Sequence, residues 1–557
     1  MSSDEGIVHT TSGDTSSPVE AATEVTDVEK LHINAIGVIG LVVGAAGAVA
    51  PLAAMFFNVP NIVTQAGAAV PLVFLISAIG MILFAVSIVY FARRISSAGG
   101  LYTWVSHALG KGAGFYAGWL MLGGYALFEA ASAAAFGGLT DSTLSQFHIL
   151  SMPGGWVTYA LLALIVVSVL TYYDVKWSVR VLAPFLALEV LSLLILDIMT
   201  IVRGGAQGQD FVHTFTTAGT ALHGVFPGGF LGIGVGMALG VWSFVGGEQG
   251  VAFGEEVRFP KRAIPYGLFG VFAGVGLLFV LTTYAAVIGG DGGWQQTAKT
   301  LGNIAIAPQP YFDLASRYVG GWLVPILYIT ISTSTFAAII AFHNGMTRYL
   351  YSMGREAVLP SWFGKTHNRW RSPYTASVVQ SLFSILVVLF LAMVFQKTNP
   401  DGSTSYAFLF SAGTGYQQTN GIFSYSWLAI IGTIAFIIVY IMVNISAPVY
   451  ARRHGELNWL AHVIAPVLSS LVLLIPLASF VLPTIPGPIG NFATSTGLFP
   501  TPFPLNILPI FPIVWLIIGL IYTTVIRRVD PDRFERLGRI VRGEEGEELV
   551  EAAAGAD

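Results

Sequence analysis

Long apolar segments fill this chain between Asn34 and Ile526, and they limit its possible folds more than any other feature. A membrane-spanning helix needs roughly 20 mainly apolar residues. Hydrophobic residues make up 54% of the chain, charged residues only 10%, and the mean hydropathy is +0.72, so an ordinary water-soluble protein is excluded. We therefore expect an all-α membrane protein. Its predicted spans are residues 34–57, 67–92, 114–139, 155–172, 181–202, 227–253, 264–288, 321–342, 374–395, 425–449, 458–482 and 507–526.

The distribution of Lys and Arg supports twelve spans. With both termini in the cytosol, 22 of the 26 basic residues fall on the cytosolic side, and only Arg203, Lys299, Arg317 and Lys397 fall outside. Cytosolic connections of membrane proteins carry such an excess. One span more or fewer would destroy this asymmetry, so twelve is the expected count. We expect a multi-pass protein of the plasma membrane.

The polar ends and the composition exclude several other classes. Residues 1–33 and 527–557 are predicted as cytosolic tails, the first of them disordered because it is rich in Ser, Thr and acidic residues. The net charge of −4 and the lack of basic blocks give no sign of nucleic-acid binding. The chain has no Cys, and its 10 His show no metal spacing. We therefore expect no metal, no cofactor and no enzyme.

Glycines interrupt the first and the sixth predicted span. In span 1 the run Gly44-Ala45-Ala46-Gly47 precedes Pro51, and in span 6 Gly246-Gly247 precedes Glu248. Glycine lowers helix propensity by about 1 kcal/mol relative to alanine, and proline removes a backbone donor. Broken helices at corresponding places in two halves indicate an inverted repeat with a central ligand site. The alternative is that these small residues only allow helices to pack closely.

Three sequence motifs lie in and after predicted span 6, after span 8 and after span 2. They are Trp242-Ser-Phe-Val-Gly-Gly-Glu248 with Gly254-Glu255-Glu256-Val-Arg-Phe-Pro260-Lys-Arg262-Ala-Ile264-Pro265, the stretch from Asn344 to Pro360, and Ser96-Ser97-Ala98-Gly99-Gly100-Leu101-Tyr102. Together they resemble the amino acid–polyamine–organocation (APC) superfamily of permeases, which share the leucine-transporter fold. The resemblance implies a first repeat at 34–202, a second, inverted repeat at 203–449, and two further helices at 450–526.

The resemblance also implies a substrate site. The run Gly44, Ala45, Ala46 and Gly47 would bind a carboxylate, although it lacks the hydroxyl of the family's Gly-Ser-Gly. Trp242, Ser243 and Phe244 would form the opposite side, with an aromatic ring closing over the ligand. Carbonyl groups freed at Gly246 and Gly247 would accept hydrogen bonds from an ammonium group, and Tyr125 of span 3 is the next candidate wall.

Four carboxylates lie inside the predicted spans, where a central charge costs about 2.5–3.5 kcal/mol. Glu189 has no basic residue within a helical turn, so we expect it to take up and release protons. Some proton-coupled relatives carry a lysine in this region, which would reverse the charge. Glu248 resembles a gating carboxylate, Glu129 is a third candidate, and Asp197 is expected to be interfacial. The alternatives are a structural carboxylate bonded to hydroxyl groups, and a sodium site at Ser334 and Thr335.

These features predict secondary active import of an amino acid across the plasma membrane, with H+ favoured over Na+ as the coupling ion. Two related alternatives are an exchanger of an amino acid for its amine product and a polyamine or ethanolamine permease. A ligand-sensing membrane receptor is the alternative from a different class. The expected partners are a small amino acid or amine, the coupling ion and the lipid bilayer. The substrate's identity and the oligomeric state stay open.

Overall fold

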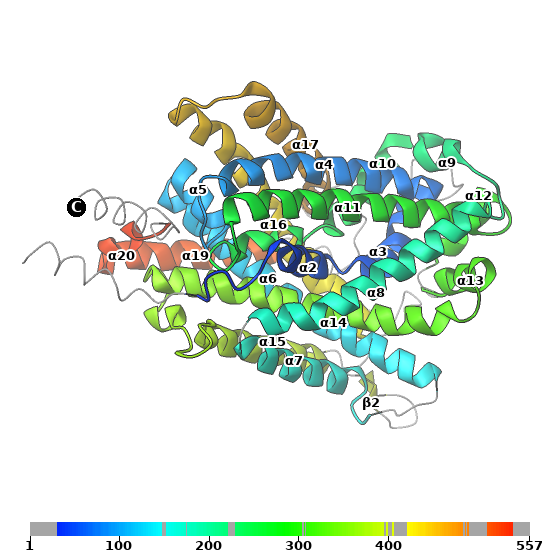
Figure 1. Ribbon diagram of the computed structural model, residues 1–557, viewed down its shortest axis with the longest axis horizontal. Helices are drawn as coiled ribbons and strands as arrows, with labels where there is room; N and C mark the ends of the chain where they lie inside the picture. The colour runs from blue at the N-terminus through cyan, green and yellow to red at the C-terminus, as the bar shows by residue number, and fades with distance from the viewer. Residues whose placement is uncertain are drawn as a thin grey trace, which may run out of the picture.

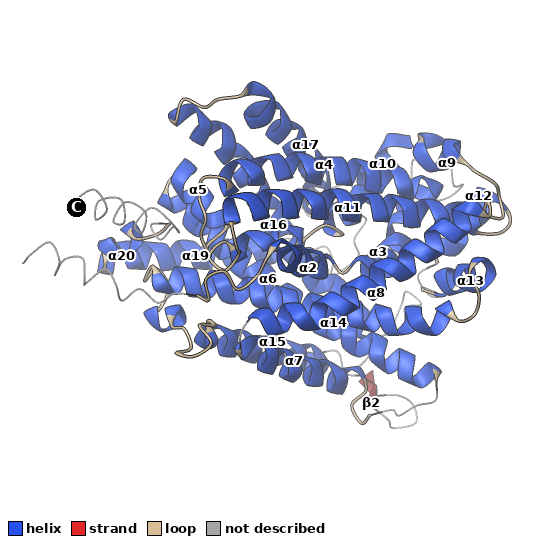
Figure 2. Cartoon of the chain, in the orientation of Figure 1, coloured by secondary structure: helices blue, strands red, loops and turns tan. Residues whose placement is uncertain are grey.

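The computed structural model describes residues 31–538, except 148–151, 174, 221–228, 304–305, 307, 395–396, 399–403, 406–419, 483–484, 486 and 489–509. Most of the two predicted tails therefore lies outside the described residues. The described part is a bundle of helices, most of which run along the long axis of the molecule (Figure 1). The strands β1 (Lys397–Thr398) and β2 (Thr404–Ser405) form one small antiparallel hairpin (Figure 2).

The longer helices fall where the sequence predicts spans. They are α2 (Val38–Val49), α3 (Pro51–Ala66), α4 (Val70–Ala92), α6 (Lys111–Gln146), α7 (Trp156–Tyr172), α8 (Val175–Val202), α10 (Gly229–Trp242), α11 (Pro260–Gly289), α14 (Leu323–Arg355), α15 (Tyr374–Val394), α16 (Asn420–Arg453), α17 (Ala465–Val481) and α19 (Ile510–Val529). The shorter connecting helices are η2 (Gly67–Ala69), α5 (Leu101–Leu109), α9 (Phe211–Phe215), η3 (Thr217–Thr220), η4 (Gly247–Phe253), α12 (Gly293–Leu301), α13 (Gln309–Tyr318), η6 (Ser361–Gly364), η7 (Trp459–Ile464) and α20 (Pro531–Glu535).

Nine helical stretches of the described chain are long and apolar enough to cross a membrane. The first, Val38–Ala92, includes α2, α3 and α4, and the apolar α7 is shorter at 17 residues. An all-helical membrane fold is thereby confirmed. The count of twelve spans, the inverted repeat and the boundaries of its halves remain predictions.

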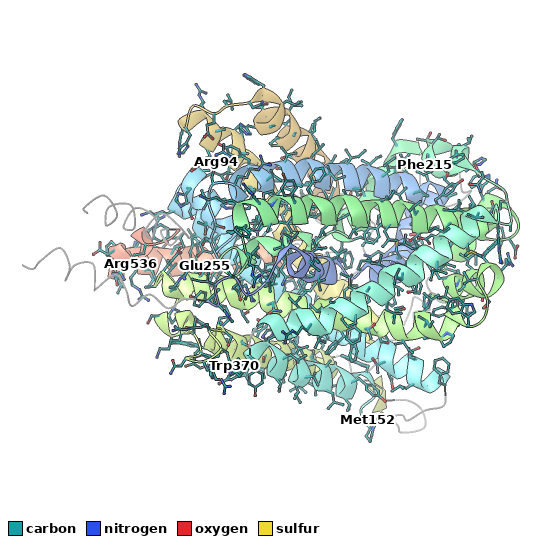
Figure 3. All side chains as sticks on the ribbon, in the orientation of Figure 1. Arg94, Met152, Phe215, Glu255, Trp370 and Arg536 are labelled. Atoms are coloured by element: carbon teal, nitrogen blue, oxygen red, sulfur yellow. The ribbon has the colours of Figure 1, made fainter. Side chains whose placement is uncertain are left out.

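The labelled side chains in Figure 3 separate into two halves of the view. Those from connections predicted to be cytosolic lie in the left half, and those from connections predicted to face outside lie in the right half. The first group is Arg94, Glu255, Trp370 and Arg536, and the second is Met152 and Phe215. Where the figure labels a residue on both sides of a predicted span, the two connections thus lie in opposite halves of the view.

The break in span 1 lies at Ala50, not at Gly44 to Gly47 as predicted. Helix α2 continues to Val49, Ala50 has the left-handed dihedrals φ 49° and ψ 67°, and Pro51 begins α3. Proline disfavours the helical conformation of the residue before it, so Pro51 sets the break. The glycines serve packing instead, since a Cβ on Gly44 would lie 3.2 Å from the ring of Phe253.

The predicted unwinding of span 6 at Gly246-Gly247 is confirmed. Helix α10 ends at Trp242, Gly246 has a φ of 96°, and the chain continues as the 3-10 helix η4. A Cβ on Gly246 would lie 2.8 Å from that of Ala48 in α2. Only glycine satisfies both the left-handed backbone and this close approach of the two broken segments.

Both broken segments lie in the interior of the bundle. Helix α2 packs against α8, α11, α14 and η4, and α3 packs against α8, α10 and α14. Figure 1 shows α2, in dark blue, near the middle of the molecule. The two helix breaks therefore meet inside the bundle, beside the long helices α8, α11 and α14.

Candidate functional site

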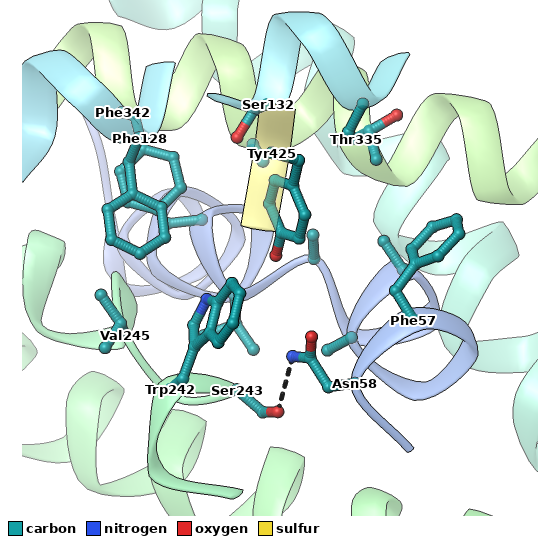
Figure 4. Close-up of a pocket in the computed structure, with 17 residues that line it drawn as sticks. Phe57, Asn58, Phe128, Ser132, Trp242, Ser243, Val245, Thr335, Phe342 and Tyr425 are labelled. Atoms are coloured by element: carbon teal, nitrogen blue, oxygen red, sulfur yellow. Dashed lines mark hydrogen bonds between the residues drawn. The ribbon is translucent and has the colours of Figure 1, made fainter. Parts of the chain in front are cut away.

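A small hollow lies between the two broken segments. Its walls come from the α2–α3 break, the end of α10, and the facing sides of α6, α14 and α16 (Figure 4). None of the described residues that line it is Asp, Glu, Lys, Arg or His. The lining residues are Ala48, Val49, Ala50, Ala53, Ala54, Phe57, Asn58, Phe128, Ser132, Ala135, Trp242, Ser243, Val245, Thr335, Ala338, Phe342 and Tyr425.

Aromatic side chains form much of the wall. Phe128 of α6 and Phe342 of α14 stack with ring centroids 4.8 Å apart, and Trp242 lies 5.6 Å from Tyr425 (Figure 4). Aromatic faces carry partial negative charge and attract cations. These rings exclude water and favour a ligand with an apolar part or an ammonium group.

One hydrogen bond joins the two broken segments across the hollow. The amide of Asn58 in α3 donates to Ser243 Oγ after α10 at 2.9 Å (Figure 4). Ser243 Oγ in turn donates to the carbonyl of Leu239 at 2.8 Å. The sequence prediction missed Asn58 because the first span was ended at residue 57. An amide side chain between Phe57 and Val59 is the signal that identifies it.

The amino-terminal end of α3 is occupied by the protein's own side chains. Glu189 Oε1, on α8, accepts the amide of Leu52 at 2.5 Å, and Ser334 Oγ, on α14, accepts that of Ala53 at 3.3 Å. Ser334 Oγ also donates to Glu189 Oε1 at 2.7 Å, and Glu189 is only 1% exposed. A helix amino terminus favours anions, so a carboxylate already fills the anion-binding end of this half-helix.

The break in span 1 also takes the helical partners from two backbone carbonyls. In an unbroken helix the carbonyls of Ala48 and Val49 would accept the amides four residues later. Those amides, of Leu52 and Ala53, turn to Glu189 and Ser334. Ala48 and Val49 both line the hollow, and the break deprives their carbonyls of the partners that an unbroken helix would supply.

Glu248 is held behind the hollow by two tyrosines. Its Oε1 accepts from Tyr125 of α6 at 2.8 Å, and its Oε2 accepts from Tyr440 of α16 and from the amide of Gly246 at 3.0 Å. Glu248 is 1% exposed. It therefore ties the break in span 6 to two long helices, which is a suitable position for a group that senses movement between them.

The predicted substrate-binding residues divide into two groups. Trp242 and Ser243 line the hollow, and the lining continues to Ala48, Val49 and Ala50, which the sequence prediction missed. The others are buried outside that lining: Gly44, Ala45, Ala46 and Gly47 within α2, Gly246 and Gly247 at the break, Tyr125 on Glu248, and Phe244, whose ring packs 5.2 Å from that of Phe279.

The remaining intramembrane carboxylates lie elsewhere. Glu129 faces α14 and α15, where it meets His343 at 3.0 Å. Asp197, expected at the interface, is 0% exposed and accepts from Thr282 Oγ1 at 2.6 Å, so its side chain is bonded within the bundle. Thr335 lines the hollow and donates to its own helix at Ser332. Among the described residues no group of three His, Asp or Glu could hold a metal ion.

A bundle of long apolar helices, two of them broken beside a central hollow, defines a polytopic membrane protein. The chain belongs to the amino acid permease family, within the APC superfamily, because that family's model matches residues 40–485. Membership places it among permeases and not among enzymes. The resemblance inferred from the motifs is thereby confirmed.

Individual relatives are more distant. An uncharacterized transporter of Rhizobium meliloti is 27% identical over 54% of this chain and 60% of its own length. Cationic amino acid transporter 7, chloroplastic, of Arabidopsis thaliana is 25% identical over 58% and 55%. A branched-chain amino acid permease of Bacillus subtilis is 23% identical over 56% and 65%. The matched region thus spans less than two thirds of the length of each of these relatives.

Proposed function

We propose that this protein imports an amino acid across the plasma membrane by proton symport, with both termini in the cytosol. The observation that carries the proposal is the bond between Glu189 and the amide of Leu52 at the edge of the central hollow. Family membership and the amino acid transporters among its relatives support an amino acid as the substrate.

Proton and substrate are coupled because Glu189 and the substrate's carboxylate compete for the same backbone amide, that of Leu52. The ionised Glu189 carboxylate holds the Leu52 N–H and, through Ser334, the neighbouring amide of Ala53. A protonated carboxyl group is a much weaker acceptor than a carboxylate. Protonation of Glu189 therefore releases the end of α3 to a substrate's carboxylate, so proton and substrate bind together. Loss of the proton inside the cell returns the amide to Glu189 and expels the substrate.

The other end of the substrate has its own partners. The substrate's ammonium group binds the carbonyls of Ala48 and Val49, while Trp242 and Phe342 cover its side chain. Glu248, linked to Tyr125 and Tyr440, acts as the gating carboxylate that reports closure of the site. In this mechanism Gly246 and Gly247 supply the flexible break, and Gly44 to Gly47 allow α2 to move against its neighbours.

A carrier of amines without a carboxylate is the second candidate. It is favoured by the same occupied helix end, because such a substrate needs no amide from α3 and leaves Glu189 in place. The uncharged aromatic hollow and the Ala48 and Val49 carbonyls suit an ammonium group. The two candidates differ in one property: only the carboxylate-bearing substrate must be accompanied by a proton.

Uptake by purified protein in proteoliposomes separates these candidates. The panel pairs amino acids with their decarboxylated amines, arginine with agmatine and leucine with isopentylamine, and adds ethanolamine and putrescine. Each is measured with an imposed acid-outside gradient, with a sodium gradient and with neither. Acid-stimulated accumulation of an amino acid is expected. Accumulation of amines alone supports the second candidate, and stimulation by sodium contradicts proton coupling.

A further inference from the structure

A buried histidine and glutamate face each other away from the central hollow. His343 Nδ1, on α14, lies 3.0 Å from Glu129 Oε1 on α6, and the two residues are 0% and 1% exposed. The other carboxylate oxygen, Glu129 Oε2, accepts from Gln380 Nε2 of α15 at 2.5 Å. Three helices therefore enclose an imidazole and a carboxyl group that share a hydrogen bond inside the bundle.

Hydrogen bonds continue from this pair to the surface. His343 Nε2 lies 2.9 Å from Ser377 Oγ on α15, and Ser377 Oγ lies 3.2 Å from Thr171 Oγ1 in the last turn of α7. Thr171 lines a second hollow together with Tyr173 and Trp370, on the connections predicted to be cytosolic. Polar contacts thus run from Glu129 to that hollow, and the Thr171 hydroxyl, which donates to the Val167 carbonyl at 2.8 Å, passes a proton to Ser377 by turning away from that carbonyl.

Within the described part of the chain, no ion pair or hydrogen bond joins a Lys or Arg to Glu129 or His343. Of the elements packed against α14, α2, α3 and η6 carry no titratable side chain, and α7 and α15 carry only tyrosines. Many of the other groups on these elements and on α14 bond elsewhere: Glu189 on Ser334, Asp197 on Thr282, Glu248 on Tyr125, Arg317 on Asp291, Asp313 on Gln309, Tyr318 on the Gly289 carbonyl, Arg348 on Glu256 and Arg355 on Glu255. Tyr311, on α13, is buried against Phe56.

A carboxylate buried beside a neutral imidazole would be an uncompensated charge, which is costly in a membrane interior. One added proton removes that cost, either as a carboxylic acid beside imidazole or as a carboxylate beside imidazolium. Histidine gives and takes protons readily at physiological pH. The pair is therefore suited to bind one proton and release it again.

We propose that Glu129 and His343 form a second proton-binding site, which exchanges its proton with the cytosolic side through Ser377 and Thr171. A proton that enters at Thr171 displaces a hydroxyl proton onto Ser377, and Ser377 passes one to Nε2 of His343. The ring then gives its Nδ1 proton to Glu129, so the imidazole ends neutral and the carboxylate ends as the acid. Rotation of the two hydroxyls and the return of the ring proton reset the route.

This site goes beyond the coupling proposed for Glu189, which lies on α8 and bonds to Leu52 directly after the break in span 1. That this site faces the cytosol rests on the proposed topology. Its protonation, however, can be measured without any transport. Glu189 exchanges its proton where substrate binds, whereas the Glu129–His343 site responds to the pH at the opposite end of the route. A transporter with both sites senses the two compartments through different residues.

Infrared difference spectroscopy on purified protein in lipid nanodiscs tests the site without transport. The spectrum between acid and alkaline pH should contain a carboxylic acid band that is lost in Glu129→Gln and shifted in His343→Gln. Glu129→Gln is isosteric and keeps the side-chain amide within reach of Gln380 and His343. The band should remain in Glu189→Gln and in the control Glu456→Gln, whose carboxylate is exposed beside Arg94.

The route is tested by the rate at which this band shifts after transfer to heavy water. Ser377→Ala and Thr171→Val leave the pair intact but remove one hydroxyl each, and each should slow the exchange by about tenfold or more. A pH spectrum unchanged by Glu129→Gln overturns the site. An exchange rate unchanged in both hydroxyl variants overturns the route. Persistence of the band in Glu189→Gln distinguishes this site from the proposed symport mechanism, whose failure would leave the band in place.

Discussion

Glu189 on α8 accepts the backbone amide of Leu52 at 2.5 Å, and so a side-chain carboxylate caps the half-helix that begins directly after the break in span 1. The two residues are 137 positions apart in the chain. The contact links the helix break, α8 and, through Ser334, α14. A change in the charge of this one carboxyl group therefore acts on the helix break and on α14, which line the central hollow, and on α8, which packs against both.

Replacement of Glu189 by glutamine should uncouple transport from protons. Glutamine imitates the protonated carboxyl group, so Glu189→Gln should keep substrate binding and substrate counterflow but lose acceleration by an acid-outside gradient. Counterflow and gradient-driven uptake in proteoliposomes measure the two properties separately. Glu456→Gln, at an exposed carboxylate, is the control and should retain both. An acid-stimulated Glu189→Gln variant would transfer the coupling role to Glu248 or Glu129.

Leucine at Gly246 should abolish uptake with little loss of expression. The residue has a φ of 96°, and its Cβ would lie 2.8 Å from that of Ala48, so the two broken segments must separate. The matched control is Gly270→Leu in α11, because a Cβ at Gly270 has no neighbour within 4 Å. The measurement is uptake per molecule, normalised to the amount of folded protein in size-exclusion chromatography. Equal uptake by the two variants would show that transport does not require the helix break at Gly246.

Two aromatic substitutions should have different effects. Trp242 lines the hollow, so Trp242→Ala should weaken substrate binding by about tenfold, which corresponds to roughly 1.4 kcal/mol. Phe244 is 0% exposed and packs on Phe279, so Phe244→Ala should chiefly destabilise the fold, by about 3–5 kcal/mol. Calorimetric binding and thermal unfolding in detergent measure the two effects. Unchanged binding in Trp242→Ala would place the substrate elsewhere.

The bond between Asn58 and Ser243 should couple the two broken segments. Asn58→Ala and Ser243→Ala each remove one partner of the 2.9 Å hydrogen bond, and the double variant removes both. A double-mutant cycle on substrate affinity should therefore give a coupling free energy of about 1 kcal/mol. Strict additivity of the two single effects would mean that this bond does not bridge the site during binding.

The sequence predicts the fold class and one of the two breaks, for identifiable physical reasons. Apolar runs and the distribution of basic residues are local properties, and Gly246-Gly247 marks its own unwinding point. The break in span 1 is displaced because Pro51 acts on Ala50 before it, while Gly44 to Gly47 stay helical. Glycine can serve either a break or close packing, and in span 1 the proline, rather than the glycine run, determines where the helix breaks.

The partners of the buried carboxylates could not be read from the sequence. Glu189 meets Ser334 145 positions away, and Glu129 meets His343 214 positions away. Such contacts depend on how the helices pack against one another, which a single sequence does not specify. A hydroxyl partner for Glu189 is the alternative that the sequence leaves open, and Ser334 is such a partner. The amide of Leu52 is available to Glu189 only because the helix breaks directly before it.

The number of protons taken up on substrate binding is the most direct test of whether Glu189 and a substrate carboxylate compete for the amide of Leu52. Titration calorimetry of one amino acid substrate in two buffers of different ionisation enthalpy gives the number of protons bound per substrate. We expect about one proton for the amino acid in the parent protein, and none for the same substrate in Glu189→Gln or for its decarboxylated amine in the parent. A heat of binding that is independent of the buffer in the parent protein would contradict the exchange of Glu189 for a substrate carboxylate.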